Sequence, residues 1–272
     1  MTRITELLRQ ASEQLDSRLE AELLLSEAVQ HPRAWLYAHG NEEIGSDEKA
    51  RFQELLQRRS QGEPVAYILG RREFYGRTFI VSPEVLIPRP ETELIVELAL
   101  QHLDSQTAEI IDVGTGSGCI GLTLAAERPS WQVTAVDNCP TALRVCQANA
   151  EKLGLERVRL AESDLLTALA DQSFDAIVSN PPYVAANDSH LTQGDLRFEP
   201  KQALSAGSDG LAIIRQLVRQ SRRQLKPAGK LIIEHGYDQG PAVQSLMTAA
   251  GFVNATTFRD LAGIDRVTFA QQ

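Results

Sequence analysis

Apolar residues in the first 60 positions recur every three or four residues, the spacing that places side chains on one face of an α-helix. The clearest set is Ile4, Leu7, Leu8, Ala11 and Leu15. A second stretch follows Asp16 and Ser17, which favour helix N-caps, and a third begins at Ser46. Short helices with one apolar stripe each must pack on one another. The pattern therefore predicts a small helical domain over residues 1–61.

The apolar spacing changes between residues 62 and 90. Residues 65–69 and 77–81 are short runs of β-branched, aromatic and aliphatic residues, and a polar segment ending in Tyr75 and Gly76 separates them. We expect these runs to pair as a β-hairpin linker over residues 62–90. Two prolines near the end of this segment interrupt regular structure, because each removes a backbone donor and restricts the residue before it. A helix from Glu91 to about Leu103 is predicted next.

From residue 108 onward, short apolar runs alternate with helical patterns. Strands are expected at 110–113, 132–136, 158–160, 176–178 and 230–233, an edge strand at 266–270, and helices at 119–127, 140–153 and 210–225. Such alternation is typical of parallel strands joined by crossovers, with helices on both faces of the sheet. We therefore predict an α/β protein with a Rossmann-like domain over residues 91–272.

The composition, 43% hydrophobic and 23% charged over 272 residues, is that of a globular protein. No apolar run approaches the ~20 residues that span a bilayer, and residues 1–6 lack the apolar core of a signal peptide. The three cysteines are odd in number and lack metal-type pairing, which argues against a disulfide framework or a zinc site. We expect a cytoplasmic protein without a metal or a membrane partner, and nothing in the sequence requires more than a monomer.

The net charge of −9 counts against nucleic acid as a partner. Binding to nucleic acid through phosphates is driven by counterion release at a basic face. Two clusters could still form a local basic patch: Arg58 with Arg59, and Arg71 with Arg72 and Arg77. We favour the simpler interpretation, in which these are solvated arginines at the ends of elements.

Three glycines stand where the first strand of the α/β region runs into its first helix. Gly114, Gly116 and Gly118 let a ligand approach the backbone without interference from a Cβ atom, and the helix N-terminus beyond them offers unpaired N–H groups. Asp137 follows the second strand, where a carboxylate can accept hydrogen bonds from both hydroxyls of a ribose. These features predict a ligand that contains adenosine.

The glycine loop leaves two cofactors open. Residues 116–121 also satisfy the GxGxxG fingerprint of nicotinamide dehydrogenases. S-adenosylmethionine is favoured because Asp112 and Gly114 extend the motif upstream and no second nucleotide-binding half follows. In this layout Asp164 would lie near the adenine, where its carboxylate can accept a proton of the exocyclic amine while Leu165 packs on the ring. An equally good interpretation is that Asp164 caps the next helix.

Asn180, Pro181, Pro182 and Tyr183 follow the apolar run 174–178, so they lie at the C-terminal end of a strand, where open α/β sheets bind ligands. The two prolines make the loop rigid. The Asn180 side-chain oxygen and the Pro181 carbonyl can accept the two protons of a planar –NH2, which aims its lone pair at a sulfonium methyl. Tyr183 can stack on the flat amide or base. Because the sulfonium already activates the methyl, positioning supplies much of the rate, and the acceptors stabilise the positive charge that develops on nitrogen.

Several segments together resemble one family. They are the glycine loop, Asn180 to Tyr183, and residues 62–67, 87–93, 194–200 and 234–236. This set is similar to the PrmC/HemK family, the N5-glutamine methyltransferases of peptide chain release factors. The Asn-Pro-Pro-Tyr loop alone is shared with adenine-N6 and other amino methyltransferases. The segment Ile-Pro-Arg-Pro-Glu-Thr-Glu at 87–93 is far more particular to this family.

The resemblance implies a class I S-adenosylmethionine-dependent methyltransferase, with S-adenosylhomocysteine as product. The implied substrate is the glutamine amide N5 in the Gly-Gly-Gln motif of bacterial class 1 release factors, with the helical domain helping to grip the factor. The family pattern, with Asp164 from the sheet layout, gives the expected cofactor contacts Gly114, Thr115, Gly116, Ser117, Gly118, Asp137, Asp164, Leu165 and Asn180. The glutamine would lie against Asn180, Pro181, Pro182 and Tyr183, among which Asn180, Pro181 and Tyr183 are the catalytic candidates. Some relatives carry an aromatic residue where Leu165 stands, so we expect an aliphatic contact with adenine.

Two other functions stay open at this point. Adenine-N6 methylation of nucleic acid uses the same Asn-Pro-Pro-Tyr loop, although the negative charge counts against it. A non-catalytic factor that binds release factors or ribosomes through the helical domain is the third hypothesis. Among nearby polar residues, Arg89 is expected to brace the site and His235 to be structural. Glu199 is expected either to shape the substrate side or to be structural.

Overall fold

The computed structural model describes residues 3–103 and 105–272. The chain divides into two compact units. The first comprises Met1–Arg71 together with Gln193–Phe198, and the second comprises Arg72–Thr192 and Glu199–Gln272. The predicted division at residues 61 and 90 stays a prediction, and the two units are described in turn.

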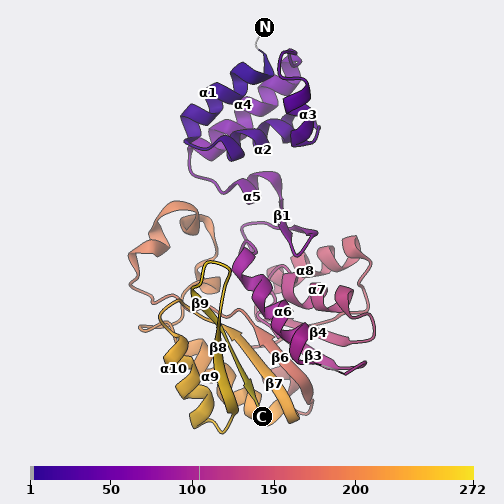
Figure 1. The fold of residues 1–272 in the computed structure, drawn as a ribbon, viewed down its shortest axis with the longest axis vertical. Coiled ribbons are helices and arrows are strands. Elements are labelled where there is room, and N and C mark those ends of the chain that lie inside the picture. The colour runs from indigo at the N-terminus through magenta and orange to yellow at the C-terminus, as the bar shows by residue number, and fades with distance from the viewer. Residues whose placement is uncertain (1–2, 104) are drawn as a thin grey trace. The chain divides into compact units, whose positions relative to one another are not determined.

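The first unit is helical, as its apolar spacing predicts (Figure 1). Its helices are α1 (Ile4–Leu15), α2 (Arg18–Val29), α3 (Arg33–Ala38), α4 (Ser46–Ser60) and α5 (Val65–Leu69). Ser17 caps α2, because its hydroxyl accepts the backbone N–H of Glu20 at 3.3 Å. The apolar stripes meet in one buried cluster, to which Ile4, Leu24 and Phe52 contribute.

The hairpin exists, but one of its predicted strands is wrong. Residues 65–69 form helix α5 instead, between Pro64 at its N-cap and Gly70, whose φ of +67° ends it. The paired strands are β1 (Arg71–Phe74) and β2 (Arg77–Ile80). Val65, Ile68 and Leu69 pack on the helical cluster, so tertiary packing decides the conformation of this β-prone run.

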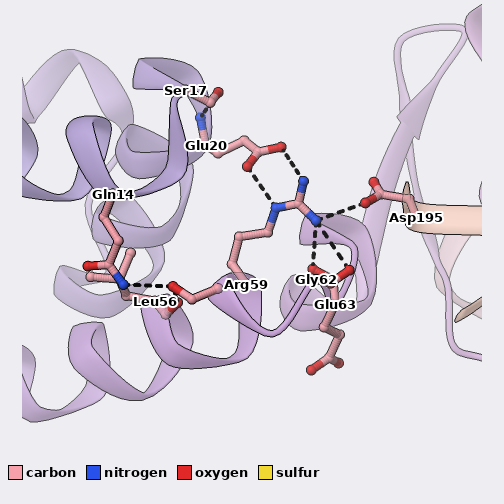
Figure 2. Close-up of polar contacts among 9 residues, drawn as sticks. Gln14, Ser17, Glu20, Leu56, Arg59, Gly62, Glu63 and Asp195 are labelled. Carbon is pink, nitrogen blue, oxygen red and sulfur yellow. Dashed lines mark hydrogen bonds and ion pairs between the residues drawn. The ribbon is translucent and has the colours of Figure 1, made fainter. Parts of the chain in front are cut away.

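A short segment from much later in the chain completes the first unit. Arg59 on α4 holds it, since its guanidinium donates to Glu20 on α2 at 2.7 and 3.0 Å and to Asp195 at 2.8 Å (Figure 2). The same guanidinium donates to two backbone carbonyls. Arg58 pairs with Glu63 at 2.6 Å. These two arginines are therefore engaged in ion pairs within the unit and are not free for a basic patch.

The second unit is built on a seven-stranded sheet of order β5-β4-β3-β6-β7-β9-β8. Its strands are β3 (Glu109–Val113), β4 (Gln132–Asp137), β5 (Arg159–Glu162), β6 (Phe174–Ser179), β7 (Leu225–Glu234), β8 (Val253–Arg259) and β9 (Asp265–Gln271). The first five in that order run parallel, and β9 is antiparallel to both β7 and β8. The prediction of an edge strand at 266–270 is wrong, because β9 lies inside the sheet and β8 forms the edge. The sequence pattern missed β8, most of whose residues are exposed or half-buried.

Helices cover both faces of this sheet (Figure 1). The first face carries α6 (Glu93–His102), α7 (Cys119–Glu127) and α8 (Pro140–Leu153), and the second carries α9 (Ala212–Gln224) and α10 (Gly240–Ala249). Successive strand residues point to opposite faces: Ile110 joins the cluster under α6–α8, and Ile111 joins the cluster under α9 and α10. Within the described chain, no helix is long and apolar enough to cross a membrane.

Five 3-10 helices lie in the connections. They are η1 (Pro90–Thr92), η2 (Thr167–Leu169), η3 (Ser189–Thr192), η4 (Gly194–Phe198) and η5 (Lys201–Ala203), counted over the described residues. The last three belong to the long connection from β6 to α9, which begins with the Asn-Pro-Pro-Tyr motif. Of these, η4 belongs to the first unit and η5 to the second.

Candidate functional site

The carboxyl ends of four neighbouring parallel strands bring the predicted motifs together. The glycine loop follows β3, Asp137 ends β4, Asp164 follows β5 and Asn180 follows β6. A cavity that is partly open to solvent lies at this edge, and the empty space in it and at its mouth is about 1090 Å³. Predicted site residues in its lining are Gly114, Thr115, Gly116, Ser117, Asp137, Asp164, Leu165, Asn180 and Pro182. Gly118, Pro181 and Tyr183, all in the described chain, are not part of the lining.

The three glycines of the loop have positive φ angles, but they serve different purposes. A Cβ atom added to Gly114 or Gly116 would meet nothing within 4 Å, so the backbone there is accessible to a ligand. A Cβ on Gly118 would lie 2.6 Å from Cys146 Sγ and 2.7 Å from Leu122 Cδ1. Gly118 is thus required for the packing of α7 against α8, which explains its absence from the cavity.

Asp112 supports the loop from beneath. Its buried Oδ2 accepts the Thr115 hydroxyl at 2.6 Å and the backbone N–H of Gly121 at 2.9 Å. Burial raises the pKa of Asp112 to about 6, although both hydrogen bonds act in the opposite direction. A Cβ on Gly121 would lie 3.0 Å from that Oδ2. The last glycine of the apparent GxGxxG fingerprint therefore makes room for a carboxylate of the protein itself.

Asp112 should make the stability of the second unit depend on pH. Its folded-state pKa of about 6 exceeds the ordinary value of 3.8, so its stabilising contribution is complete below pH 3.8 and is lost as the pH rises to about 6. Relative to Asp112→Asn, the wild type is expected to lose up to ~3 kcal/mol of unfolding free energy across that interval. Urea denaturation of both proteins at a series of pH values measures the difference. A difference that stays constant with pH would contradict this assignment.

Asp137 is ordered beside the glycine loop. Its Oδ2 accepts the backbone N–H of Gly116 at 2.9 Å, and its Oδ1 accepts that of Cys139 at 3.0 Å. Burial raises the pKa of this carboxyl, and the backbone N–H groups lower it. Each carboxylate oxygen keeps a lone pair beyond these bonds. The side chain can therefore accept hydrogen bonds from two vicinal hydroxyls of a ligand in the cavity.

Leu165 lines the cavity in an uncommon conformation, with φ of +51°. The turn around it is held by the Asp164 carbonyl, which accepts the backbone N–H of Thr167 at 3.1 Å, and by the Ser163 hydroxyl, which accepts that of Ala168 at 3.1 Å. These bonds use the carbonyl of Asp164 and leave its exposed carboxylate outside the turn. Leu165 thus offers an aliphatic surface to a ligand.

Thr92 sets the orientation of the Asn180 side chain. The amide nitrogen of Asn180 donates to Thr92 Oγ1 at 3.0 Å, so its Oδ1 is the atom left to accept an N–H in the cavity. The residue before it is also fixed, because the Ser179 hydroxyl donates to the carbonyl of Val113 on β3 at 2.7 Å. The amide is therefore held in one direction at the end of β6.

Tyr183 is held from two sides. Its hydroxyl donates to Glu234 Oε1 at 3.3 Å, and its carbonyl accepts Gln239 Nε2 at 3.0 Å. The ring packs on the hydrophobic cluster under α9 and α10. Gly210, with φ of +71°, passes so close that a Cβ would lie 2.2 Å from the Tyr183 carbonyl oxygen. The stacking of Tyr183 on a flat substrate stays a prediction.

The sequence does not predict the roles of Thr92, Glu234, Gln239 and Gly210. Thr92 and Glu234 occur only within segments that resemble the family, at 87–93 and 234–236, and Gln239 and Gly210 lie outside every predicted motif. A glycine two residues before a helix gives a weak signal by itself. The other three are ordinary polar residues whose partners lie far away in the sequence. Their contribution to the site becomes visible only in the folded chain.

Arg89 and His235 both have structural surroundings. Arg89 forms an ion pair with the buried Glu199, which also accepts the backbone N–H of Ile87 at 3.1 Å. This pair ties the proline-rich segment before α6 to the start of η5. The two ring nitrogens of His235 lie 2.9 Å from the carbonyl oxygen of Gly236 and 2.8 Å from Thr268 Oγ1. Burial lowers its pKa, and its imidazole does not line the cavity.

A parallel sheet with an antiparallel last pair and a cofactor-sized cavity at its carboxyl edge defines the class I S-adenosylmethionine-dependent methyltransferase fold. Solved structures agree. The hMettl16 catalytic domain in complex with an RNA hairpin is similar with a TM-score of 0.59 and 17% identity, covering 80% of this chain and 81% of that one. The 16S rRNA N2 G1207 methyltransferase of T. Thermophilus, in complex with AdoMet and guanosine, is similar with a TM-score of 0.56 and 22% identity. The match covers 74% of this chain and 49% of that one.

The sequence comparisons are more specific than the fold. The family model for the methyltransferase small domain matches residues 92–250, and that for the PrmC N-terminal domain matches residues 2–70. The release factor glutamine methyltransferase of Pseudomonas aeruginosa is 48% identical, covering 100% of this chain and 99% of that protein. The Escherichia coli K12 protein of the same name is 42% identical, covering 97% of each. The chain belongs to the release factor glutamine methyltransferase family.

Proposed function

We propose that this protein transfers a methyl group from S-adenosylmethionine to the side-chain amide N5 of the glutamine in the Gly-Gly-Gln motif of bacterial class 1 release factors. The observation that carries the proposal is the Asn180 amide, whose oxygen is free to accept an N–H in the cavity that Gly116 and Asp137 also line. The names and extents of the similar proteins support a release factor as the substrate. S-adenosylhomocysteine is the second product, and the proposal includes neither a metal nor a nucleic acid.

The residues of the cavity fit S-adenosylmethionine. Gly114 and Gly116 leave room for a ligand against the backbone, and Asp137 offers carboxylate oxygens for ribose hydroxyls. We assign further cofactor contacts to Thr115, Ser117, Asp164 and Leu165, which line the same cavity. Gly118 has a packing role and supports the loop indirectly. When bound, the cofactor supplies a methyl group that its sulfonium charge has already activated.

The chain's own contribution is to position the acceptor amide. We assign the two N–H bonds of the glutamine –NH2 to the Asn180 Oδ1 and the Pro181 carbonyl, with Pro182 and Tyr183 completing the acceptor side. This directs the nitrogen lone pair toward the methyl carbon. Methylation of the amide by the bound cofactor, which would leave as S-adenosylhomocysteine, would place positive charge on the amide nitrogen. The two acceptor oxygens stabilise that charge, and the nitrogen then loses one of its protons.

We propose that the chain has three functional parts. Residues 1–61 bind the release factor, residues 62–90 form a linker, and residues 91–272 form the domain that catalyses methyl transfer. The match to the PrmC N-terminal domain supports a shared role for the helical part. We further propose that the enzyme works as a monomer in the cytoplasm. Its three cysteines are free thiols, as that compartment would keep them.

The direct test uses labelled S-adenosylmethionine with two substrates, a class 1 release factor and the same factor with its Gly-Gly-Gln glutamine replaced by glutamate. Label is expected in the first and not in the second. Equal labelling of the two factors would overturn the assignment. A parallel reaction with DNA and RNA tests adenine-N6 methylation, which the shared Asn-Pro-Pro-Tyr loop permits. Faster labelling of nucleic acid than of the release factor would favour that alternative.

A further inference from the structure

Two buried polar residues, Thr92 and Glu234, lie next to the Asn-Pro-Pro-Tyr loop, and of these Thr92 also lines the cavity whereas Glu234 does not. Glu234 is the last residue of β7 and is 1% exposed, and Thr92 on η1 is 2% exposed. Thr92 accepts the Asn180 amide nitrogen, and Glu234 accepts the Tyr183 hydroxyl. The neighbouring hydroxyls of Thr92 and Tyr183 both lower the pKa of the Glu234 carboxyl. Two hydrogen bonds thus hold the two polar ends of the Asn-Pro-Pro-Tyr motif, and the Thr92 hydroxyl lies close enough to the Glu234 carboxyl to lower its pKa.

The chemistry of Asn180, Thr92 and Glu234 determines which of these groups can donate a hydrogen bond and which can only accept one. A hydroxyl has one proton to donate, whereas an ionised carboxylate can only accept. Glu234 Oε2 has no hydrogen-bond partner within the described chain, so this carboxylate has acceptor capacity to spare for the Thr92 proton. Once that proton is directed to Glu234, Thr92 presents only lone pairs to Asn180. The –NH2 of Asn180 must then face Thr92, and its oxygen must face the cavity.

We propose that Glu234 and Thr92 are positioning residues that fix the orientation of the Asn180 amide and thereby present its oxygen to the substrate. This inference rests on the proposed function, because the orientation of the Asn180 amide matters only if its oxygen accepts an N–H of the substrate. Glu234 does not line the cavity, and Thr92, which does, acts through its hydrogen bond with Asn180. Glu234 acts through Thr92 on the asparagine and through its own hydrogen bond on Tyr183.

The surroundings of Glu234 fit a carboxylate that is ionised above neutral pH. Burial raises its pKa to about 7, and Arg266 on β9 lowers it, as do the neighbouring hydroxyls of Thr92 and Tyr183. Glu91 on η1 raises it further, and Cys119 on α7 also interacts with this carboxylate. A protonated Glu234 could itself donate to Thr92. The Thr92 proton would then be free to point toward Asn180, and the Asn180 amide would no longer be held in one orientation. Turnover of the wild type should therefore fall below about pH 7.

The test compares isosteric variants that alter hydrogen bonding but not volume. In Glu234→Gln the new –NH2 can donate to Thr92, and in Thr92→Val the hydroxyl is lost. Each is expected to lower kcat about 10- to 100-fold, with the KM for S-adenosylmethionine changed less than about threefold. Thr92→Ser keeps the hydroxyl and should recover most of kcat. Glu234→Gln should also lack the wild-type decline in kcat below about pH 7.

Thr123→Val is the matched control, because Thr123 is buried on α7, and its hydroxyl has no hydrogen-bond partner among the described residues. Its kcat should equal that of the wild type. If Thr123→Val lowers kcat as much as Thr92→Val does, the effect is general to buried substitutions and the inference fails. Wild-type kcat in Glu234→Gln or in Thr92→Val would also overturn it.

A spectroscopic measurement separates this inference from the proposed function. The side-chain –NH2 signals of Asn180 can be identified in a 15N–1H NMR spectrum by their loss in Asn180→Ala. In the wild type they should be shifted and protected from exchange by the bond to Thr92. Both Thr92→Val and Glu234→Gln should abolish that protection. If it is abolished while the wild type methylates no release factor, the positioning inference stands and the proposed function fails. Unchanged protection would overturn the inference alone.

Discussion

Replacing Asn180 by alanine is expected to lower kcat for methyl transfer by about 10²- to 10³-fold, the usual consequence of removing one preorganised polar contact to the reacting group. The side-chain oxygen that accepts the substrate N–H would be lost, and so would the bond to Thr92. The fold should survive, because the side chain is only half-buried. Steady-state kinetics with a release factor, together with the dissociation constant of S-adenosylmethionine, measure the effect.

The matched control for this prediction is Asn187→Ala. Asn187 is exposed and lies seven positions further along the same connection, outside the cavity lining. It should retain wild-type kcat. A fall in cofactor affinity large enough to explain the whole loss in Asn180→Ala would show that this residue acts on the cofactor and not on the acceptor.

Gly210→Ala is expected to reduce kcat more than 10²-fold and to cost about 1–3 kcal/mol of unfolding free energy. The residue has φ of +71°, which strains any side chain, and its Cβ would lie 2.2 Å from the Tyr183 carbonyl oxygen and 2.8 Å from Gln239 Nε2. The strained backbone and the steric clash of the new Cβ with the Tyr183 carbonyl should both displace Tyr183 from its position beside Glu234 and Gln239. Since Pro181 and Pro182 make the loop rigid, displacement of Tyr183 should also move Asn180.

Gly263→Ala separates strain from collision. Gly263 has φ of +78°, and a Cβ there would meet nothing within 4 Å. This variant should lose about 1 kcal/mol of unfolding free energy and keep its activity. If kinetics and thermal denaturation show that Gly210→Ala loses no more activity than Gly263→Ala, the contact with Tyr183 is not important for catalysis.

The α/β architecture was predictable because buried parallel strands and amphipathic helices leave distinct periods in a sequence. The run at 119–127 became α7 with the same bounds, and that at 140–153 became α8. Prediction failed where packing overrides local preference. Residues 65–69 are rich in strand formers, yet they form α5 because their apolar side chains complete the helical cluster. The edge strand β8 alternates weakly, since each of its residues is exposed or half-buried.

The residues that contact a ligand were easier to predict than those that hold them in place. Glycines, an acid after the second strand and Asn-Pro-Pro-Tyr are local patterns with a chemical meaning. By contrast, the contact of Thr92 with Asn180 joins residues 88 positions apart. The close approach of Gly210 to Tyr183 likewise depends on how a long connection folds back. Such pairs leave no periodic trace in a single sequence.

The short segment Gln193–Phe198 has a consequence for how the protein can be divided. The backbone passes from one compact unit to the other after Arg71, after Thr192 and after Phe198. One cut in the hairpin region would therefore divide the first unit itself, because residues 193–198 would stay on the fragment that carries the second unit. A helical fragment that stops at residue 71 would lack the carboxylate of Asp195, one of the two that neutralise Arg59 (Figure 2). An autonomous version of this domain should carry the later hexapeptide as well, for example through a designed fusion or circular permutation.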